Sequence, residues 1–204
     1  MDKKKILKFI GIFLIIIFLI LLIFFIRNFI IISNLSKSNS NTLSSNNYSC
    51  SLNLNHSNDT TFEYYYKDGI IVELKKINND VVFKNWYDTK SKEHISIDLV
   101  NSTVQTRNKN DMFVVSNLKS SIDNIFENKF KSAIMFSIRN DDFNGEKCYK
   151  LNSRYGLKDY DYYFNKNTGI IKSLNHQMIV VNDFKVNNVT DLQVEKPDLS
   201  NYNI

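Results

Sequence analysis

The stretch TFEYYYKDGIIVEL, residues 61–74, gives the strongest indication of the fold of this chain. Its aromatic residues Phe62, Tyr64 and Tyr66 occupy every second position, which is the pattern of a strand with one buried face. Asp68-Gly69 follows, a dipeptide that favours the two-residue turn between the strands of a hairpin. A second apolar run comes directly after the turn. The stretch therefore predicts a β-hairpin within an antiparallel sheet.

The same period of two continues on both sides of this hairpin. Further strands are predicted over residues 48–55, 81–86, 94–99, 134–138, 147–151, 160–164 and 170–174, with a last pair over 178–181 and 184–194. A helical period interrupts them within residues 116–128, where Leu118, Ile122, Ile125 and Phe126 share one face. The pattern predicts an α+β domain in which a single antiparallel, strongly curved sheet, an incomplete β-barrel, packs on one or two helices.

An apolar segment precedes the domain. From Phe9 to Ile26 every residue is apolar or glycine, and after Arg27-Asn28 the run resumes up to Ile32. About 20 helical residues are enough to cross the hydrocarbon core of a bilayer. A cleavable signal peptide has a shorter apolar region that ends in small residues, which do not follow this run. Residues 9–32 are therefore predicted to be an uncleaved transmembrane helix, a signal-anchor.

The flanks of this segment predict the topology. A cluster of four lysines lies within residues 1–8, whereas few basic residues follow the run, so the N-terminal tail is expected to be cytoplasmic. Residues 33–47 are rich in Ser and Asn and predict a linker. Residues 48–204 would then form one extracytoplasmic domain. The chain is expected to be a single-pass protein of the cell membrane.

The charge of the chain excludes one class of function. The formal net charge is +5, and about +4 of it comes from the basic flanks of the apolar segment. A nucleic-acid-binding protein needs its Lys and Arg residues as a patch that faces phosphates, and the near-neutral domain does not supply one. The heavy use of Asn, Lys and Ile with a single alanine is typical of an AT-rich genome and fits a bacterial cell envelope.

Residues that commonly carry catalysis are scattered along this sequence. His56, His94 and His176 lie far apart, without the close spacing of zinc ligands, and His94 is expected to face water. The five glycines are isolated, so no phosphate-binding loop is recognisable. The acidic residues form no pair that is typical of a catalytic cleft. We therefore expect neither an enzyme nor a bound cofactor or metal.

The two cysteines, Cys50 and Cys148, both lie in the predicted extracytoplasmic domain. Outside the cytoplasm such a pair can form a disulfide, which makes a Cys50–Cys148 bridge one hypothesis. Cys50 also belongs to the apolar face of its strand, so two buried free thiols are an equally good alternative. The sequence leaves both open.

Aromatic side chains give the best indication of function. Tyr-rich and Phe-rich strands on a curved sheet can enclose an apolar cavity, the usual form of a small-molecule site. The alternative is that the same rings simply fill the core. The residues expected to bound such a cavity are Phe62, Tyr64, Tyr66, Phe83, Ile95, Ile97, Phe136 and Cys148.

Three segments in the last third of the chain carry a resemblance to a known family. They are GEKCYKL at 145–151, YFNKNTGIIK at 163–172 and VTDLQVEKPDLSNY at 189–202. They resemble the closing strands of the LolA-like and LppX-like lipoprotein carriers, and the order of elements is similar over residues 48–203. The resemblance implies an incomplete β-barrel closed on one side by helices, a cavity that holds acyl chains, and no enzymatic activity.

The chain also departs from that family. It carries a membrane anchor in place of a soluble or lipidated form, and the arginine that helps the carriers hold lipoprotein has no matching position, so no binding residue is carried over. The leading hypothesis is a membrane-anchored protein that binds a lipid or an acylated peptide as a holder or sensor at the cell envelope. The alternative is a non-enzymatic interaction or signalling module with a filled core and a protein partner.

Overall fold

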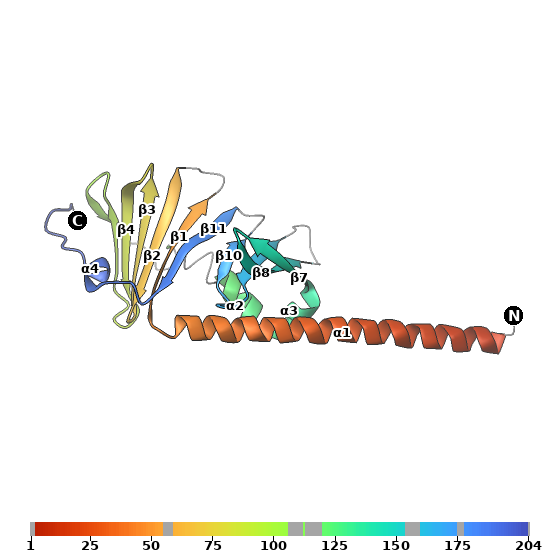
Figure 1. Cartoon of the computed structure of the whole chain (residues 1–204). Coiled ribbons are helices and arrows are strands. Elements are labelled where there is room, and N and C mark those ends of the chain that lie inside the picture. The colour runs from red at the N-terminus through yellow and green to blue at the C-terminus, as the bar shows by residue number, and fades with distance from the viewer. Residues whose placement is uncertain are drawn as a thin grey trace.

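The computed structural model describes residues 3–54, 59–105, 112, 120–153, 160–174 and 178–203 (Figure 1). The helices are α1 (Lys3–Leu43), α2 (Ser120–Glu127), α3 (Lys129–Met135) and α4 (Asp191–Val194). The strands are β1 (Asn47–Leu54), β2 (Thr60–Lys67), β3 (Ile70–Ile77), β4 (Asp80–Asp88), β5 (His94–Asp98), β6 (Thr103–Gln105), β7 (Phe136–Phe143), β8 (Glu146–Ser153), β9 (Asp161–Asn165), β10 (Ile171–Leu174) and β11 (Ile179–Val186). The predicted α+β class is confirmed.

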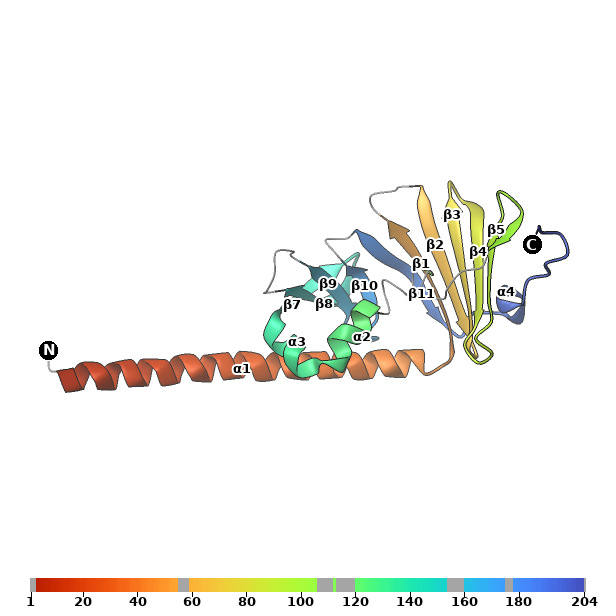
Figure 2. The same ribbon diagram turned by 180° about the vertical axis from the view of Figure 1, so that it is seen from behind.

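All eleven strands belong to one antiparallel sheet, in the order β6-β5-β4-β3-β2-β1-β11-β10-β9-β8-β7. The first and last strands of the domain, β1 and β11, pair in its middle, and β6 and β7 form its two edges. The chain passes from one edge to the other through α2 and α3, which lie beside α1 (Figure 2). The sheet is strongly curved and does not close, as expected for an incomplete barrel.

The hairpin turns follow from local backbone chemistry. Asp68 and Gly69 both have positive φ angles, 51° and 98°, as the predicted turn between β2 and β3 requires. Asn78 and Asn79, between β3 and β4, repeat this with φ angles of 53° and 70°. Asparagine, aspartate and glycine tolerate this left-handed conformation better than other residues. The meander of β2, β3 and β4 is therefore encoded by short sequence signals.

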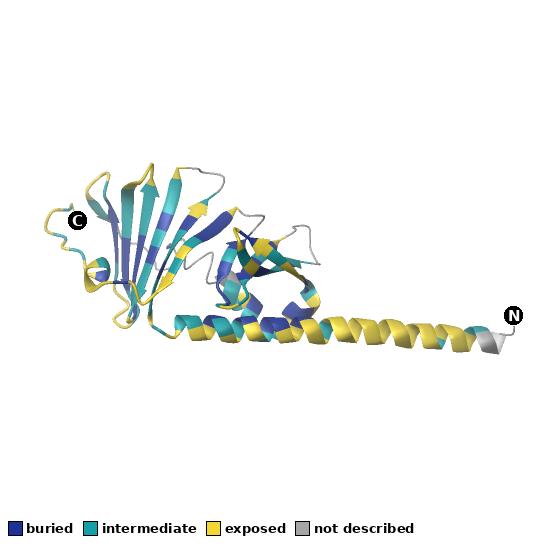
Figure 3. Cartoon of the chain, viewed as in Figure 1, coloured by how far each residue is buried: buried dark blue, intermediate teal, exposed yellow. Residues whose placement is uncertain are grey.

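Helix α1 is unbroken over about 60 Å. Its apolar first half is exposed and projects away from the domain, whereas its second half lies against the domain (Figure 3). By length and composition the first half could cross a membrane, as an anchor or as a signal sequence. The helix contacts α2, α3 and β7, so the apolar half is joined to the domain by a continuous helix.

The segment 33–47, expected to be a flexible linker, is helical up to Leu43. Leu35 and Asn39 are buried, and the Asn39 amide donates a hydrogen bond to the Gly169 carbonyl at 3.1 Å. Gly169 belongs to the turn between β9 and β10, which approaches α1 so closely that a Cβ there would collide with the Leu35 carbonyl oxygen. These long-range contacts offset the ordering entropy that the Ser- and Asn-rich composition suggests.

The helices on the inner side of the sheet differ from the prediction. Helix α2 covers part of the expected helix, and Leu118 lies outside the described residues. Helix α3 was not expected; it includes Ile134 and Met135, so that β7 begins at Phe136. Ser132 and Ala133 of α3 are buried, and α3 contacts α1. This tertiary packing selects a helix where the sequence alone favours a strand.

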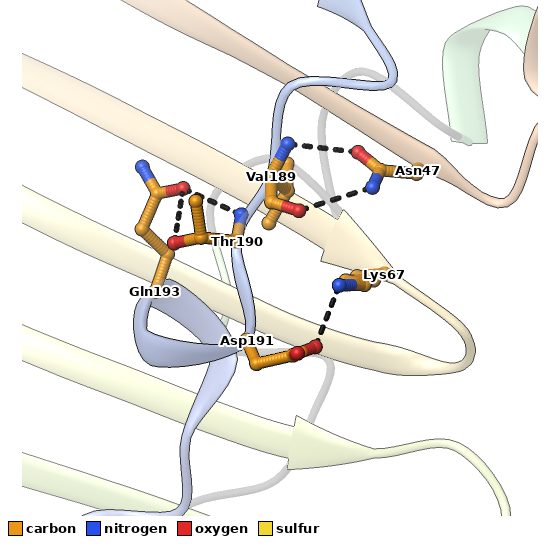
Figure 4. Close-up of polar contacts among 6 residues, drawn as sticks. All are labelled: Asn47, Lys67, Val189, Thr190, Asp191 and Gln193. Carbon is orange, nitrogen blue, oxygen red and sulfur yellow. Dashed lines mark hydrogen bonds and ion pairs between the residues drawn. The ribbon is translucent and has the colours of Figure 1, made fainter.

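The last pair of strands, expected over residues 178–181 and 184–194, is replaced by the single strand β11. Strand β11 is followed by residues 187–203, here called the C-terminal strap, which contains α4. Asn47 holds the strap by two hydrogen bonds with the backbone of Val189, and Lys67 pairs with Asp191 at 2.6 Å (Figure 4). Thr190 and Gln193 cap α4 reciprocally. Residues 189–191, part of the motif that resembles the closing strands of the carriers, therefore attach the strap to the sheet and are not themselves a strand.

Each face of the sheet has its own apolar core. The inner face, which is turned toward α1, α2 and α3, packs against Ile32 and Leu35 of α1 and Ile125 of α2. The outer face of β3, β4 and β5 packs under the C-terminal strap, through Val189 and Val194. The outer face of these strands is thus apolar and covered by the strap.

Candidate functional site

A cavity of about 510 Å³ opens between the inner face of the sheet and the two helices α1 and α2. Strands β1, β2, β3, β4, β10 and β11 supply its wall. Its lining residues are Asn39, Leu43, Tyr48, Cys50, Tyr64, Tyr66, Ile71, Tyr87, Thr89, Lys92, Ile122, Asp123, Ile170, Ile171, Val181 and Phe184. This volume falls within the range of small-molecule sites.

Strand register brings the aromatic rings of the wall into line. Tyr48 of β1 lies opposite Tyr66 of β2, which lies opposite Ile71 of β3, which lies opposite Tyr87 of β4. Residues directly opposite in an antiparallel sheet point to the same face. Four strands with alternating sequence therefore place one continuous row of large side chains at the cavity.

Tyrosine rings stack along this row. The Tyr48 ring lies 4.9 Å from the Tyr66 ring and 5.9 Å from the Phe184 ring, both nearly parallel to it. Burial, with a smaller effect of Tyr66, raises the pKa of Tyr48 to about 12, and burial raises the pKa of Tyr64 well above its usual range. Tyr48 and Tyr64 both stay neutral at physiological pH, so the wall is apolar with phenol groups available for hydrogen bonding.

A polar row runs beside the aromatic row. Tyr64 lies opposite Glu73, followed by Asn85 and Ser96 on the next strands, and all three polar side chains are buried, Glu73 to 1% exposure. The Asn85 amide donates to a Glu73 carboxylate oxygen at 3.3 Å. The amide oxygen of Asn85 and the Ser96 hydroxyl have no hydrogen-bond partner in the described part of the chain. Buried polar groups are usually satisfied, so this row is a source of hydrogen-bonding capacity next to the cavity.

The rim of the cavity is polar. Lys92 and Thr89 come from the loop after β4, and Asp123 comes from the first turn of α2. The Lys92 ammonium group donates to the Thr89 carbonyl at 2.6 Å. An apolar wall with charged residues at the mouth suits an amphiphilic ligand better than a fully charged one.

The structure separates the predicted cavity residues into three groups. Tyr64 and Tyr66 line the cavity. Phe62 and Phe136 are buried in the inner core outside the lining, and Phe83 lies on the inner face below the ammonium group of Lys75.

Ile95, Ile97 and Cys148 do not bound the cavity, because they lie on the outer face. Ile95 lies opposite Trp86, and both isoleucines belong to the core under the C-terminal strap. Cys148 packs with Phe143 and Tyr163 in a separate outer cluster. The alternation of β5 identifies its apolar side, but that side is covered by the strap and not by the helices.

Tyr48, Tyr87 and Phe184 are the aromatic wall residues that sequence reasoning missed. Tyr48 could have been found, because it begins the alternating strand that includes Cys50. Tyr87 is adjacent to Trp86, and the sequence gives no sign which of these two rings faces inward. Phe184 follows Asp183, whose φ of 49° disturbs the strand period.

The disulfide hypothesis is corrected by the position of the two cysteines, which are free thiols. Cys50 lies on β1 at the inner face, and Cys148 lies on β8 at the outer face, with β11, β10 and β9 between them. Burial, with a smaller effect of Glu73, raises the pKa of Cys50 to about 12, and burial also raises the pKa of Cys148. Both thiols stay protonated and are poor nucleophiles at physiological pH.

His94 was expected to face water, but it belongs to the inner face of the sheet. It lies opposite Tyr87, and the two rings meet edge to face at 6.1 Å. His56 and His176 lie outside the described residues. Among the described residues, no three His, Cys, Asp or Glu side chains come together as a metal site would require.

Comparison with known proteins adds no relative that would assign this cavity a ligand. No protein-family model matches the chain, and no curated protein matches it significantly.

Proposed function

We propose that the chain is a single-pass membrane protein whose extracytoplasmic domain binds an apolar ligand, a lipid or an acylated peptide, as a holder or sensor at the cell envelope. The observation that carries this proposal is the 510 Å³ cavity with its wall of tyrosine and aliphatic side chains. The interaction module with a filled core is less favoured, because it requires side chains to occupy this space.

The polarity of the site supports an amphiphilic ligand. Its wall offers apolar surface from Ile71, Ile171 and Val181, and the phenol groups at neutral pH are hydrogen-bonding groups without charge. Lys92 at the rim offers one positive charge to an anionic headgroup or carboxylate. An open curved sheet with helices on one face is also the architecture that the resemblance to LolA-like carriers implies, which is support by analogy.

The position of the cavity supports a holder or sensor at the membrane. Leu43, which lines the cavity, follows the last exposed apolar residue of α1, Ile30, by about 20 Å of helix. A ligand in the cavity would therefore be held outside the bilayer and at a fixed distance from it. A protein tethered in this way suits holding or sensing near the surface more than shuttling over a long distance.

The experiment is native mass spectrometry of the full chain, extracted from its host membrane in a mild detergent, compared with its denatured mass. We expect an excess mass that dissociates as a lipid or an acylated species. Ile122→Trp would fill the cavity from α2 and should remove this mass, whereas Asn124→Trp, on the exposed side of the same helix, should retain it. A chain that remains empty after incubation with lipid extract would refute the proposal.

A further inference from the structure

Helix α3 carries apolar side chains on its outside. Phe130 is 64% exposed and Ile134 is 45% exposed, and they lie one turn apart on the same side of the helix. Ser132 and Ala133, on the other side, are buried against the domain. A helix that faces water normally has the opposite distribution.

This exposed side lies next to the apolar half of α1. The Phe130 ring contacts the Phe25 ring, with centroids 4.9 Å apart. The exposed apolar surface of α1 continues past Phe25 to Ile30, which is 52% exposed. Five residues of helix correspond to about 7.5 Å, so α3 lies beside the outer end of the apolar run and not beyond it.

Polar residues of α1 fix α3 and β7 at this position along the helix. The Arg27 guanidinium donates to the Ile138 carbonyl at 3.0 Å, and the Asn28 amide donates to the carbonyls of Ala133 and Phe136 at 3.1 and 3.0 Å. These are the two polar residues that interrupt the apolar run. Backbone carbonyls of the domain thus accept hydrogen bonds from both side chains, and the domain cannot slide along α1 without breaking these bonds.

The residues on either side of Phe130 fit a lipid surface. Lys129 and Lys131 are neighbours of Phe130, and long lysine side chains can reach phosphate groups while the backbone lies deeper. Aromatic and aliphatic residues flanked by lysine are typical of helices that lie in the membrane interface.

We propose that α3 docks into the outer interface of the bilayer, with Phe130 and Ile134 among the upper acyl chains and Lys129 and Lys131 at the headgroups. The inference rests on the proposed membrane anchoring of α1. We assign lipid as the partner of the exposed side of α3, because this side is continuous with the apolar surface of α1. This second contact would fix the tilt of the domain, and with it the direction in which the cavity mouth points.

The test uses tryptophan fluorescence of the full chain in phosphatidylcholine and phosphatidylglycerol vesicles, with and without brominated acyl chains, which quench tryptophan on contact. Phe130→Trp and Ile134→Trp report on α3. The native Trp86 is buried on the outer face and provides the baseline. Leu192→Trp, at a position of α4 that is 78% exposed, is the matched control for an exposed apolar residue. Phe18→Trp, in the middle of the apolar run, reports on the anchor itself.

Bromine near the headgroup end of the acyl chains should quench about half of the emission added by Trp at 130 and 134, and leave Trp86 and Trp at 192 unchanged. Phe18→Trp should be quenched most by bromine near the chain ends. Quenching at 18 without quenching at 130 and 134 would overturn the docking of α3 and leave the anchor standing. No quenching at 18 would overturn the anchor and the inference together. Equal quenching at 192 and 130 would overturn the specific placement of α3.

Discussion

Residues 9–26 and residues 27–43 belong to the same unbroken helix, α1, and have nearly the same length. The first half is apolar on all sides, and no residue in it is buried. The second half is rich in Ser and Asn, and yet buries Ile32, Leu35 and Asn39 in the domain. Burial in this molecule therefore does not follow local hydrophobicity. A segment is buried where another part of the chain folds back and offers a surface complementary to it.

The returning surface is the turn between β9 and β10 together with α3 and β7. Asn28 and Asn39 of the second half donate hydrogen bonds to backbone carbonyls of this surface. Such bonds satisfy carbonyls that would otherwise be buried without a partner, so polar residues here stabilise the contact. Among the described residues, the first half contacts the domain at its end, where the Phe25 ring meets the Phe130 ring, and its other side chains are exposed, which is why lipid is the environment we propose for it.

The largest expected effect comes from adding a side chain at Gly169. Gly169→Val would force a Cβ against the Leu35 carbonyl and strain a backbone with φ of +66°, so we expect a loss of about 4 kcal/mol in unfolding free energy. Urea unfolding of the full chain in detergent, followed by Trp86 fluorescence, measures it. Gly11→Val, where a Cβ meets nothing within 4 Å, should leave the transition unchanged. Equal behaviour of the two variants would contradict the docking of the second half.

Truncation of a buried leucine should have the next largest effect. Leu35 is 1% exposed, and Leu35→Ala should lower the unfolding free energy by about 3 kcal/mol, through lost burial and the cavity left behind. Leu21→Ala, at a position that is 61% exposed, should not change the unfolding of the domain. The same urea transition distinguishes them. A stable Leu35→Ala variant would mean that the second half of α1 is not part of the core.

Removal of one amide should have a smaller effect. Asn28→Ala would leave the carbonyls of Ala133 and Phe136 without their donor, at a cost of about 2 kcal/mol. Asn34→Ala, on the exposed side of the same helix, is the control and should be neutral. Thermal unfolding of both variants gives the comparison. An effect at Asn34 as large as that at Asn28 would show that helix propensity, and not the contact with α3 and β7, is measured.

The effect of pH should be absent over the physiological range. Burial raises the pKa of Cys50 from 9.0 and of Tyr48 from 10.0, each to about 12 in the folded domain. A raised pKa contributes stability that is fully present below the ordinary value and is lost as pH rises toward the folded value. The domain should therefore keep its stability up to about pH 9 and lose it between about pH 9 and 12.

The first half of α1 carries no ionisable residue between Phe9 and Ile26, so its helical circular dichroism should persist through this alkaline transition while Trp86 fluorescence changes. Cys50→Ala should weaken the loss of stability just above pH 9 without abolishing it, because Cys148, whose pKa is also raised from 9.0 by burial, remains. A domain whose stability is constant up to pH 12 would contradict the buried position of both groups at the cavity.

Short-range signals predicted much of the sheet. Asp68-Gly69 and Asn78-Asn79 encode their turns through the backbone angles that these residues tolerate, and the alternating strands between them follow. Tyr64 and Tyr66 were found as cavity residues because their strand has a clear period of two. Ile95 and Ile97 were assigned to the wrong face, because β5 is apolar on a side that only the distant C-terminal strap covers.

Signals between neighbouring residues encode the apolar helix, the hairpins and the α+β class, because each depends on residues that are close together in the chain. Tertiary packing makes a Ser- and Asn-rich segment helical, places Ile134 in a helix, and puts Cys50 and Cys148 on opposite faces. It also decided which rings enclose the cavity. These features depend on which distant part of the chain packs against a segment. A surface formed by residues more than a hundred positions away leaves no periodic signal in the segment that it covers.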